Sequence, residues 1–190
     1  MTSAFFAESE IHTLSSYNSV DVIRTAKFGQ NCGEFANIEA MSNNSLFTSG
    51  WEVTGVRSAE KFFSALTEIL ALPVYFCLEG TSISSDVRTL LASSSVAPAL
   101  RIPPGTIWPK PSVFHVLATE QFIHELAAVA RRNAEPEVCD HFHAYDDSHG
   151  LIQWYDAFDL PLLLNESISE ASIQSFCRKL GAEYGQWRAA

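Results

Sequence analysis

Residues 138–158 have the sequence VCDHFHAYDDSHGLIQWYDAF. Two runs rich in aromatic and aliphatic residues, 138–145 and 151–158, flank the turn-forming residues 146–150. This pattern predicts a β-hairpin. Pairing Tyr145 with Leu151 sets the register, and the predicted opposite pairs are then His143 with Gln153, His141 with Tyr155, and Asp140 with Asp156.

The hairpin has two predicted faces, because successive side chains of a strand point to opposite sides. One face is apolar apart from two aspartates and has the composition of a core: Val138, Phe142, Ala144, Ile152, Trp154 and Phe158, with Asp140 and Asp156. The other face is aromatic and polar: His141, His143, Tyr145, Gln153 and Tyr155. Such a mixture is typical of recognition surfaces. We therefore expect His141 and His143 to be at least partly exposed, next to Tyr155.

The strongest signal in the sequence is a segregation of charge. No Lys or Arg occurs between Arg132 and Arg178, and this acidic segment, residues 133–177, contains nine acids: Glu135, Glu137, Asp140, Asp146, Asp147, Asp156, Asp159, Glu166 and Glu170. The rest of the chain has 22 − 9 = 13 acidic residues against 12 basic ones, so nearly all of the net charge of −10 belongs to the acidic segment. A patch of one sign attracts cationic partners.

Composition excludes several classes of partner. The isoelectric point near 4.9 argues against nucleic acid, since no basic stripe is present to neutralise phosphates, and against anionic membrane surfaces. No apolar run approaches the length of a membrane span, and the first residues lack the basic region of a signal peptide. The four cysteines form no CxxC pair, which favours a reducing compartment. We expect a cytoplasmic protein with a basic protein partner; its oligomeric state is not indicated.

A metal site is the weaker interpretation of the hairpin histidines. His141 and His143 lie two apart on one strand, so their imidazoles point the same way, as zinc ligands often do. Zinc needs a third protein ligand, whereas the opposite positions hold Gln153 and Tyr155, and His149 would have to reach round from the turn. The sequence thus predicts no metal and no cofactor, with His141, His143 and His149 as the alternative.

Catalytic motifs are weak. Asp140 and Asp156 could form a close carboxylate pair for acid–base chemistry, or both could be solvated. Residues 80–84, GTSIS, lack the second glycine of a nucleophile elbow, and no GxGxxG or Walker A sequence occurs. Cys139 shares a predicted strand face with His141, but adjacency on one strand is not a dyad geometry.

Residues 102–111, IPPGTIWPKP, form a proline-rich loop. Four prolines restrict its backbone, so a side chain displayed there loses little entropy on binding. Trp108 is either such a preorganised anchor or a side chain that packs back onto the sheet. With Trp108 included, the predicted partner-binding residues are His141, His143, Tyr145, Asp146, Asp147, Gln153, Tyr155, Asp159 and Trp108.

Residues 51–190 predict one α/β domain. Strand patterns at 51–56, 74–78 and 113–117 alternate with helical patterns that begin near Ser58, Ser84 or Ser85, Glu120 and Ser167, the last ending at Gly181. This order predicts a single domain with a mixed sheet, parallel crossovers, helices packed on the sheet, and a C-terminal β-hairpin plus helix. The residues expected in its core are Phe62, Leu66, Phe76, Leu78, Val116, Phe122, Leu126, Trp154 and Phe176.

Residues 1–50 are rich in Ser and Asn and show no sustained period. They predict an N-terminal arm or an irregular cover, with a strand pattern only at 20–28 and loops at 43–45 and 49–50.

Together these patterns lead to a non-catalytic cytosolic protein-binding module, an acidic inhibitor of the immunity-protein type that neutralises a cationic partner. This version is an analogy from charge and size. Two alternatives stay open: a small hydrolase or metal-dependent enzyme that uses the His141 and His143 region, and a subunit of a larger complex.

Overall fold

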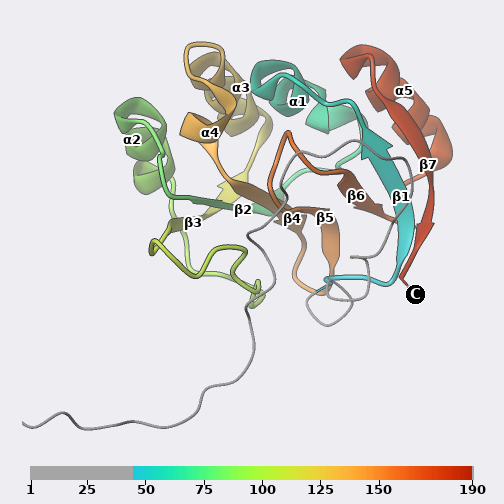
Figure 1. Cartoon of the computed structure of the whole chain (residues 1–190), viewed down its shortest axis with the longest axis horizontal. Coiled ribbons are helices and arrows are strands. Elements are labelled where there is room, and N and C mark those ends of the chain that lie inside the picture. The colour runs from blue at the N-terminus through green and yellow to red at the C-terminus, as the bar shows by residue number, and fades with distance from the viewer. Residues whose placement is uncertain (1–44, 190) are drawn as a thin grey trace, which may run out of the picture. The chain divides into compact units, whose positions relative to one another are not determined.

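A computed structural model describes residues 45–189, all within one compact unit (Figure 1). Seven strands form one sheet in the order β3-β2-β4-β5-β6-β1-β7. The strands are β1 (Ser49–Thr54), β2 (Val74–Gly80), β3 (Ser112–Ala118), β4 (His141–Tyr145), β5 (Gly150–Trp154), β6 (Leu162–Asn165) and β7 (Glu183–Arg188). The predicted α/β class, with helices on the sheet and a C-terminal hairpin followed by a helix, is confirmed.

The direction of the strands differs from the expectation. Each pairing in the described sheet is antiparallel, so the parallel crossovers predicted from the strand–helix alternation are wrong. β1 pairs with β6 and β7 from the far end of the chain rather than with β2, and β2 and β3 are direct neighbours that pair antiparallel although α2 lies between them in the chain. Hydrophobic periodicity predicts the type of an element but not its neighbours.

The helices of residues 45–189 lie on one side of the sheet, along the top of Figure 1. They are α1 (Ala59–Ala65), which continues into a 3₁₀ turn at Leu66–Glu68 (η2), α2 (Ser85–Ser93), α3 (Glu120–Ala130), α4 (Glu135–Val138) and α5 (Glu170–Leu180). Helix α1 contacts both α3 and α5. The helices therefore cover one face of the sheet and leave the other face to loops.

The ends of the helices follow local chemistry. The hydroxyl of Ser58 accepts from the Lys61 amide at the start of α1, as the sequence predicts. Gly181 ends α5 in the left-handed conformation, with φ of 68°, also as predicted. The predicted cap at Ser167 is wrong, because Ser169 is the residue whose hydroxyl accepts at the first turn of α5.

The core lies between the helices and the sheet. All nine residues predicted to be buried are buried. Its centre is Phe62 of α1, whose ring centroid lies 4.8–6.2 Å from five other aromatic rings: Phe63, Phe142, Trp154, Phe158 and Phe176. Edge-to-face aromatic packing of this kind adds stabilisation beyond the buried area.

The hairpin β4–β5 forms with nearly the predicted register. His143 pairs with Gln153 and Ala144 with Ile152 as expected, but Tyr145 pairs with Gly150 instead of Leu151, across a bulge. A bulge absorbs one extra residue locally. The alternation of the two faces is therefore preserved along the strands.

Three elements were not anticipated from the sequence: β6, α4 and β7. The hairpin and the last helix were expected to complete the chain, but β6 lies between them and β7 follows. Residues 49–50, expected as a loop, begin β1. The predicted strand at 20–28 and the loop at 43–44 lie outside the described residues, and the predicted boundary between an arm and the domain at residue 50 stays a prediction.

Candidate functional site

The side of the sheet opposite the helices carries a row of polar side chains, here called the polar face: Glu79, His141, His143, Tyr145 and Gln153. All five are buried. The expectation that His141 and His143 are at least partly exposed is therefore wrong. The prediction that both histidines share a face with Tyr155 is confirmed. The centroid of the Tyr155 ring lies 5.5 Å from that of the His141 ring and 4.9 Å from that of the His143 ring.

Loops supply the cover of the polar face. The proline-rich loop contacts Glu79 and His141, and the backbone amide of Leu46 donates to the Gln153 side chain at 2.7 Å. The sequence pattern identified the face, but it could not indicate that distant loops bury it. A role of these residues in binding a partner stays a prediction, and their burial weighs against it.

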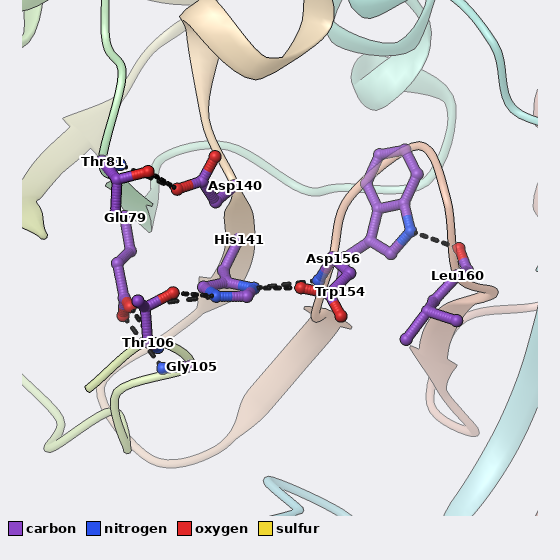
Figure 2. A network of polar contacts seen from close by, with 9 residues as sticks. All are labelled: Glu79, Thr81, Gly105, Thr106, Asp140, His141, Trp154, Asp156 and Leu160. Carbon is purple, nitrogen blue, oxygen red and sulfur yellow. Dashed lines mark hydrogen bonds and ion pairs between the residues drawn. The ribbon is translucent and has the colours of Figure 1, made fainter. Parts of the chain in front are cut away.

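Glu79 is a carboxylate buried at the end of β2 (Figure 2). Its two oxygens accept from the backbone amides of Gly105 and Thr106, at 3.0 and 2.6 Å. A buried charge is costly unless it is hydrogen-bonded, and charge-assisted bonds to backbone amides meet that requirement. Glu79 therefore fixes the centre of the proline-rich loop to the sheet.

His141 is held at both ring nitrogens. Nδ1 accepts from the Asp156 amide at 2.9 Å, so this nitrogen carries no proton. The proton belongs on Nε2, which lies 2.8 Å from the Thr106 hydroxyl and donates to it. With the ring neutral, the approach of Nε2 to Glu79 at 3.9 Å is a packing contact and not an ion pair. We call Glu79, Gly105, Thr106, His141 and Asp156 the Glu79–His141 cluster.

Position 105 requires a glycine, because the proline-rich loop passes too close to the His141 ring for a residue with a Cβ atom. A Cβ atom at position 105 would lie 2.3 Å from the Cδ2 atom of the His141 ring. That ring cannot rotate away without losing its bonds at both nitrogens. The glycine in the proline-rich loop thus has a packing reason.

A strained turn follows β5. Asp156 and Phe158 have positive φ angles of 44° and 75°, and a bulky residue in that region is an outlier. The turn directs the Asp156 amide toward His141 and lets Trp154 Nε1 donate to the Leu160 carbonyl at 2.7 Å (Figure 2). It also packs Phe158 with its ring centroid 4.5 Å from that of Trp154. Strain of this kind persists only where surrounding contacts over-determine it.

Asp140 and Asp156, considered as a carboxylate pair, have separate partners. Asp140 accepts from the amide and the hydroxyl of Thr81, both at 2.7 Å. The Asp156 carboxylate lies 3.8 Å from His141 Nδ1, and about half of this side chain is exposed. The two therefore form no shared acid–base unit.

His143 is completely buried, and within the described part of the chain neither of its ring nitrogens has a hydrogen-bond partner. Burial lowers the pKa of His143 to about 3, and the nearby His141 and His115 act in the same direction. The imidazole is thus neutral at physiological pH. The His143 and Tyr155 rings meet in a T-shaped arrangement, with their centroids 4.9 Å apart.

A second chain of polar contacts crosses the sheet at His115 of β3. His115 Nδ1 lies 2.7 Å from the Tyr145 hydroxyl, and Nε2 lies 3.7 Å from Cys77 Sγ. Burial raises the pKa of the Cys77 thiol to about 12, and it also raises the pKa of the Cys139 thiol. Reactive cysteines have lowered pKa values, so these two have the character of structural buried thiols.

The arrangement Thr106–His141–Asp156 has the residue types of a catalytic triad but the opposite polarity. In a triad the histidine accepts the proton of the hydroxyl and donates to the acid through its other nitrogen. Here Nδ1 accepts from a backbone amide, and Nε2 therefore donates to Thr106. His141 cannot act as a base toward Thr106 in this geometry.

The alternative metal ligands do not converge. His149 lies in the hairpin turn, bonded to Ser148 and close to Asp146, at the opposite end of β4 from His141. Within residues 45–189 no group of three or more His, Cys, Asp or Glu side chains is placed to hold a metal ion.

The remaining predicted contact residues are on the surface but in two places. Asp146 and Asp147 lie at the hairpin turn, whereas Asp159 lies beyond the other end of β5. Trp108, on the proline-rich loop, is 82 % exposed, so it does not pack back onto the sheet. The structure thus divides the predicted partner surface between the two ends of the hairpin.

Comparisons with protein-family models, with curated proteins and with solved structures found no match. Among residues 45–189, no helix combines the length and the hydropathy needed to cross a bilayer. Sequence reasoning missed Glu79 and Thr106 as members of the site. A signal for Glu79 existed, since it directly follows the continuous apolar run of residues 74–78 in one strand.

Proposed function

We propose that this protein is a non-catalytic protein-binding module, an acidic inhibitor of the immunity-protein type, which binds a cationic partner protein through the acidic segment. One observation carries the proposal. All nine carboxylates of the acidic segment are at least partly exposed, and none of them forms an ion pair with Lys or Arg in the described part of the chain.

Three acids elsewhere in the described chain are paired with a base, whereas Glu52, Glu120, Glu125 and Glu183 are not. Glu60 lies 3.9 Å from Arg131, Asp86 lies 3.4 Å from Arg132, and Glu68 lies 2.5 Å from Lys179. Compensated surface charges of this kind contribute little field beyond their neighbourhood. The acids of residues 133–177 have no Lys or Arg partner among the described residues, and their negative charge favours encounter with a basic protein.

The two alternative functions have less support. A hydrolase would require a base and an activated nucleophile, and the bonding of His141 orients its proton toward Thr106 instead. A subunit of a larger complex would use the same exposed acids, and it differs from an inhibitor only in the identity of the partner.

The test is recovery of partners from the native host on the immobilised full chain, with the recovered proteins sorted by isoelectric point, followed by binding kinetics across a salt series. Asp147 and Asp159 are reversed to Lys together. Asp146 is left unchanged because its carboxylate accepts from the amides of Ser148 and His149 and holds the turn.

We expect the double reversal to lower the association rate, because exposed charges act before contact, and salt to lower it as well, because screening becomes effective beyond about 8 Å at physiological ionic strength. The matched control is Glu125→Lys with Glu183→Lys, two exposed acids outside the acidic segment, which changes the net charge equally. An acidic partner, or equal effects of the two pairs, would refute the proposal.

A further inference from the structure

The two edges of the described sheet differ in how they are covered. Its outermost strands are β3 and β7 (Figure 1). Along β3, Ser95 forms a bridge with Val116, and the Val96 amide donates to the His115 carbonyl at 2.8 Å. Along the outer side of β7, no segment of residues 45–189 pairs with the strand. The edge at β7 is therefore open to pairing.

The sequence of β7, EYGQWR, does not protect this edge. Proteins commonly blunt an edge strand with Pro, with Lys or with a bulge, because unpaired backbone groups are a template for another strand. Strand β7 contains neither Pro nor Lys, and its six pairs with β1 run without a bulge. Such a regular edge suits the addition of a further strand.

The hydrogen bonds to β1 indicate which backbone groups of β7 remain unpaired. The Ala189 amide donates to the Thr48 carbonyl at 2.8 Å, which continues the register of the β1–β7 ladder. Because hydrogen-bonded pairs alternate with non-hydrogen-bonded pairs, the odd-numbered positions of β7 bond to β1. The amides and carbonyls of Tyr184, Gln186 and Arg188 therefore point away from β1, and no described residue bonds to them.

These three outward positions select one register for two copies of β7. Antiparallel strands bond where the backbone groups of both opposed residues point at each other. With a two-fold axis at Gln186, this residue lies opposite its own copy, and Tyr184 of each chain lies opposite Arg188 of the other. All three positions are then paired, whereas an axis at Gly185 or Trp187 leaves one of them without a partner in β7.

The charges on the helix side of β7 are complementary in this register. Arg188 is exposed and forms no ion pair among residues 45–189. The Tyr184 hydroxyl donates to the Glu170 carboxylate at 3.4 Å. Arg188 of the second copy, opposite Tyr184, thus meets an aromatic ring and a carboxylate, which are both favourable partners for a guanidinium group.

The other side of β7 is complementary in shape. Trp187 of one copy lies opposite Gly185 of the other in the same register. A Cβ atom at Gly185 would meet nothing within 4 Å, so open space is present above this glycine. An aromatic ring that lies over a glycine of a neighbouring strand stabilises the pairing.

We propose that two copies of this chain associate through β7, antiparallel and with the two-fold axis at Gln186, so that their sheets form one continuous sheet. The occupant is a second copy because the sequence of β7 meets the backbone, charge and shape requirements of its own edge. Two-fold dimers are the commonest homo-oligomers, and their interfaces are self-complementary in this way. The inference does not depend on the proposed function.

Sedimentation velocity of the full chain over about 1–500 µM tests the association, since a small interface dissociates in such a range. We expect monomers at the low end and dimers at the high end. Gln186→Pro removes an amide that points away from β1 and puts a ring in the path of the second copy, so it should raise the dissociation constant at least about tenfold. A wild type that is monomeric throughout, or a dimer unaffected by Gln186→Pro, would overturn the proposal.

An exchange of charges tests the register, and it also serves if Gln186→Pro does not fold. Arg188→Glu and Glu170→Arg each set like charges against each other in both halves of the dimer, so each variant alone should dissociate at least about tenfold more readily. An equal mixture of the two variants restores both attractive pairs and should dimerise like the wild type. Arg101→Glu, an exposed position outside β7, is the control and should leave the dimer unchanged. A mixture no stronger than the single variants would contradict the register.

Hydrogen exchange resolved by residue identifies the occupant of the edge. The amides of Tyr184, Gln186 and Arg188 should exchange slowly in concentrated samples and at least about tenfold faster in dilute ones, whereas the β1-bonded amides of Gly185 and Trp187 should stay protected in both. Slow exchange of the outward amides in a monomeric sample would mean that a segment of the same chain covers β7. Fast exchange at every concentration would mean that the edge is free. Either result would refute the dimer.

Discussion

The two faces of the sheet are built from the same strands but are buried by different means. On the helix side, Phe142 and Trp154 pack against Phe62 in an apolar core. On the polar face, the adjacent residues His141 and Gln153 are buried under loops that hydrogen-bond to them. His141 and Phe142 are neighbours in β4 but point to opposite faces of the sheet. Phe142 is stabilised by buried apolar area, whereas His141 is stabilised by hydrogen bonds.

Because the two faces are buried by different means, they should respond differently to substitutions and to pH. An apolar core loses free energy roughly in proportion to the volume removed, and it does not depend on pH. A buried polar face depends on every donor and acceptor remaining paired, and on the protonation state of its groups. The predictions below test this contrast, beginning with the largest expected effect.

The helix side should show the largest loss. Phe142→Ala removes a ring that lies 5.0–5.7 Å from those of Phe62, Phe63 and Phe76, and it should lower the free energy of unfolding by about 3–5 kcal/mol. Leu126→Ala and Phe176→Ala should each cost about 2–5 kcal/mol. Urea denaturation measures all three, and losses near zero would mean that the faces are wrongly assigned.

The polar face can be disturbed by one added methyl group. Gly105→Ala forces a carbon against the His141 ring and should cost about 1–3 kcal/mol, as overpacking does. Gly185→Ala in β7 is the control, since a Cβ there meets nothing within 4 Å. If the two variants have equal stability, the loop does not lie against His141 as described.

The polar face should also be sensitive to acid in a way that the core is not. The pKa of His143 is about 3 in the folded chain, below the ordinary value of 6.5, so the unfolded chain binds a proton that the folded chain does not. Stability from this residue is complete above about pH 6.5 and is lost as the pH falls from there toward 3. Between pH 7 and 5 the loss should be about 2 kcal/mol.

His143→Phe should abolish most of that slope, measured by denaturation at several pH values. His124→Gln, at an exposed position, is the control and should retain it. The range from pH 7 to 5 lies above the titration of carboxylates such as Asp86, whose hydrogen bonds with Ser84 and Asn133 lower its pKa to about 2. A wild-type stability that is constant from pH 7 to 5 would contradict the buried, unbonded state of His143.

The smallest effect belongs to the exposed acids, which take part in neither face. Asp147→Lys with Asp159→Lys breaks no ion pair with Lys or Arg in residues 45–189, so the free energy of unfolding should change by no more than about 0.5 kcal/mol. Thermal unfolding checks this. A loss above about 1 kcal/mol would assign these acids a structural role and remove them from the proposed interface.

Local patterns were sufficient for much of the fold. The alternation in β4 and β5 predicted which hairpin residues share a face, the helical spacing predicted the core, and Ser58 and Gly181 marked helix ends. These features depend on residues close in sequence. The four-residue strand β6 and the mostly polar strand β7 carry too little periodicity to be recognised.

The site was less predictable, because its decisive contacts join distant residues. Glu79 binds amides 26 and 27 positions away, and Thr106 meets His141 from 35 positions away. No pattern within the hairpin indicates that this loop covers it, so the histidines were expected at the surface. Charge segregation needed no such pairing and is the part of the site that the sequence indicated directly. The sequence left open whether Trp108 is exposed, and the structure shows that it is.

The place of β1 in the sheet has a consequence for the timing of folding. Trp51 pairs with Leu164 on one side and with Gln186 on the other, so this early strand acquires both neighbours only from the end of the described chain. Synthesis delivers residues in order, and contacts between distant residues form slowly. The nascent chain must therefore keep β1 unpaired while β2 to β5 are produced, and the sheet is completed only after residue 188 becomes available.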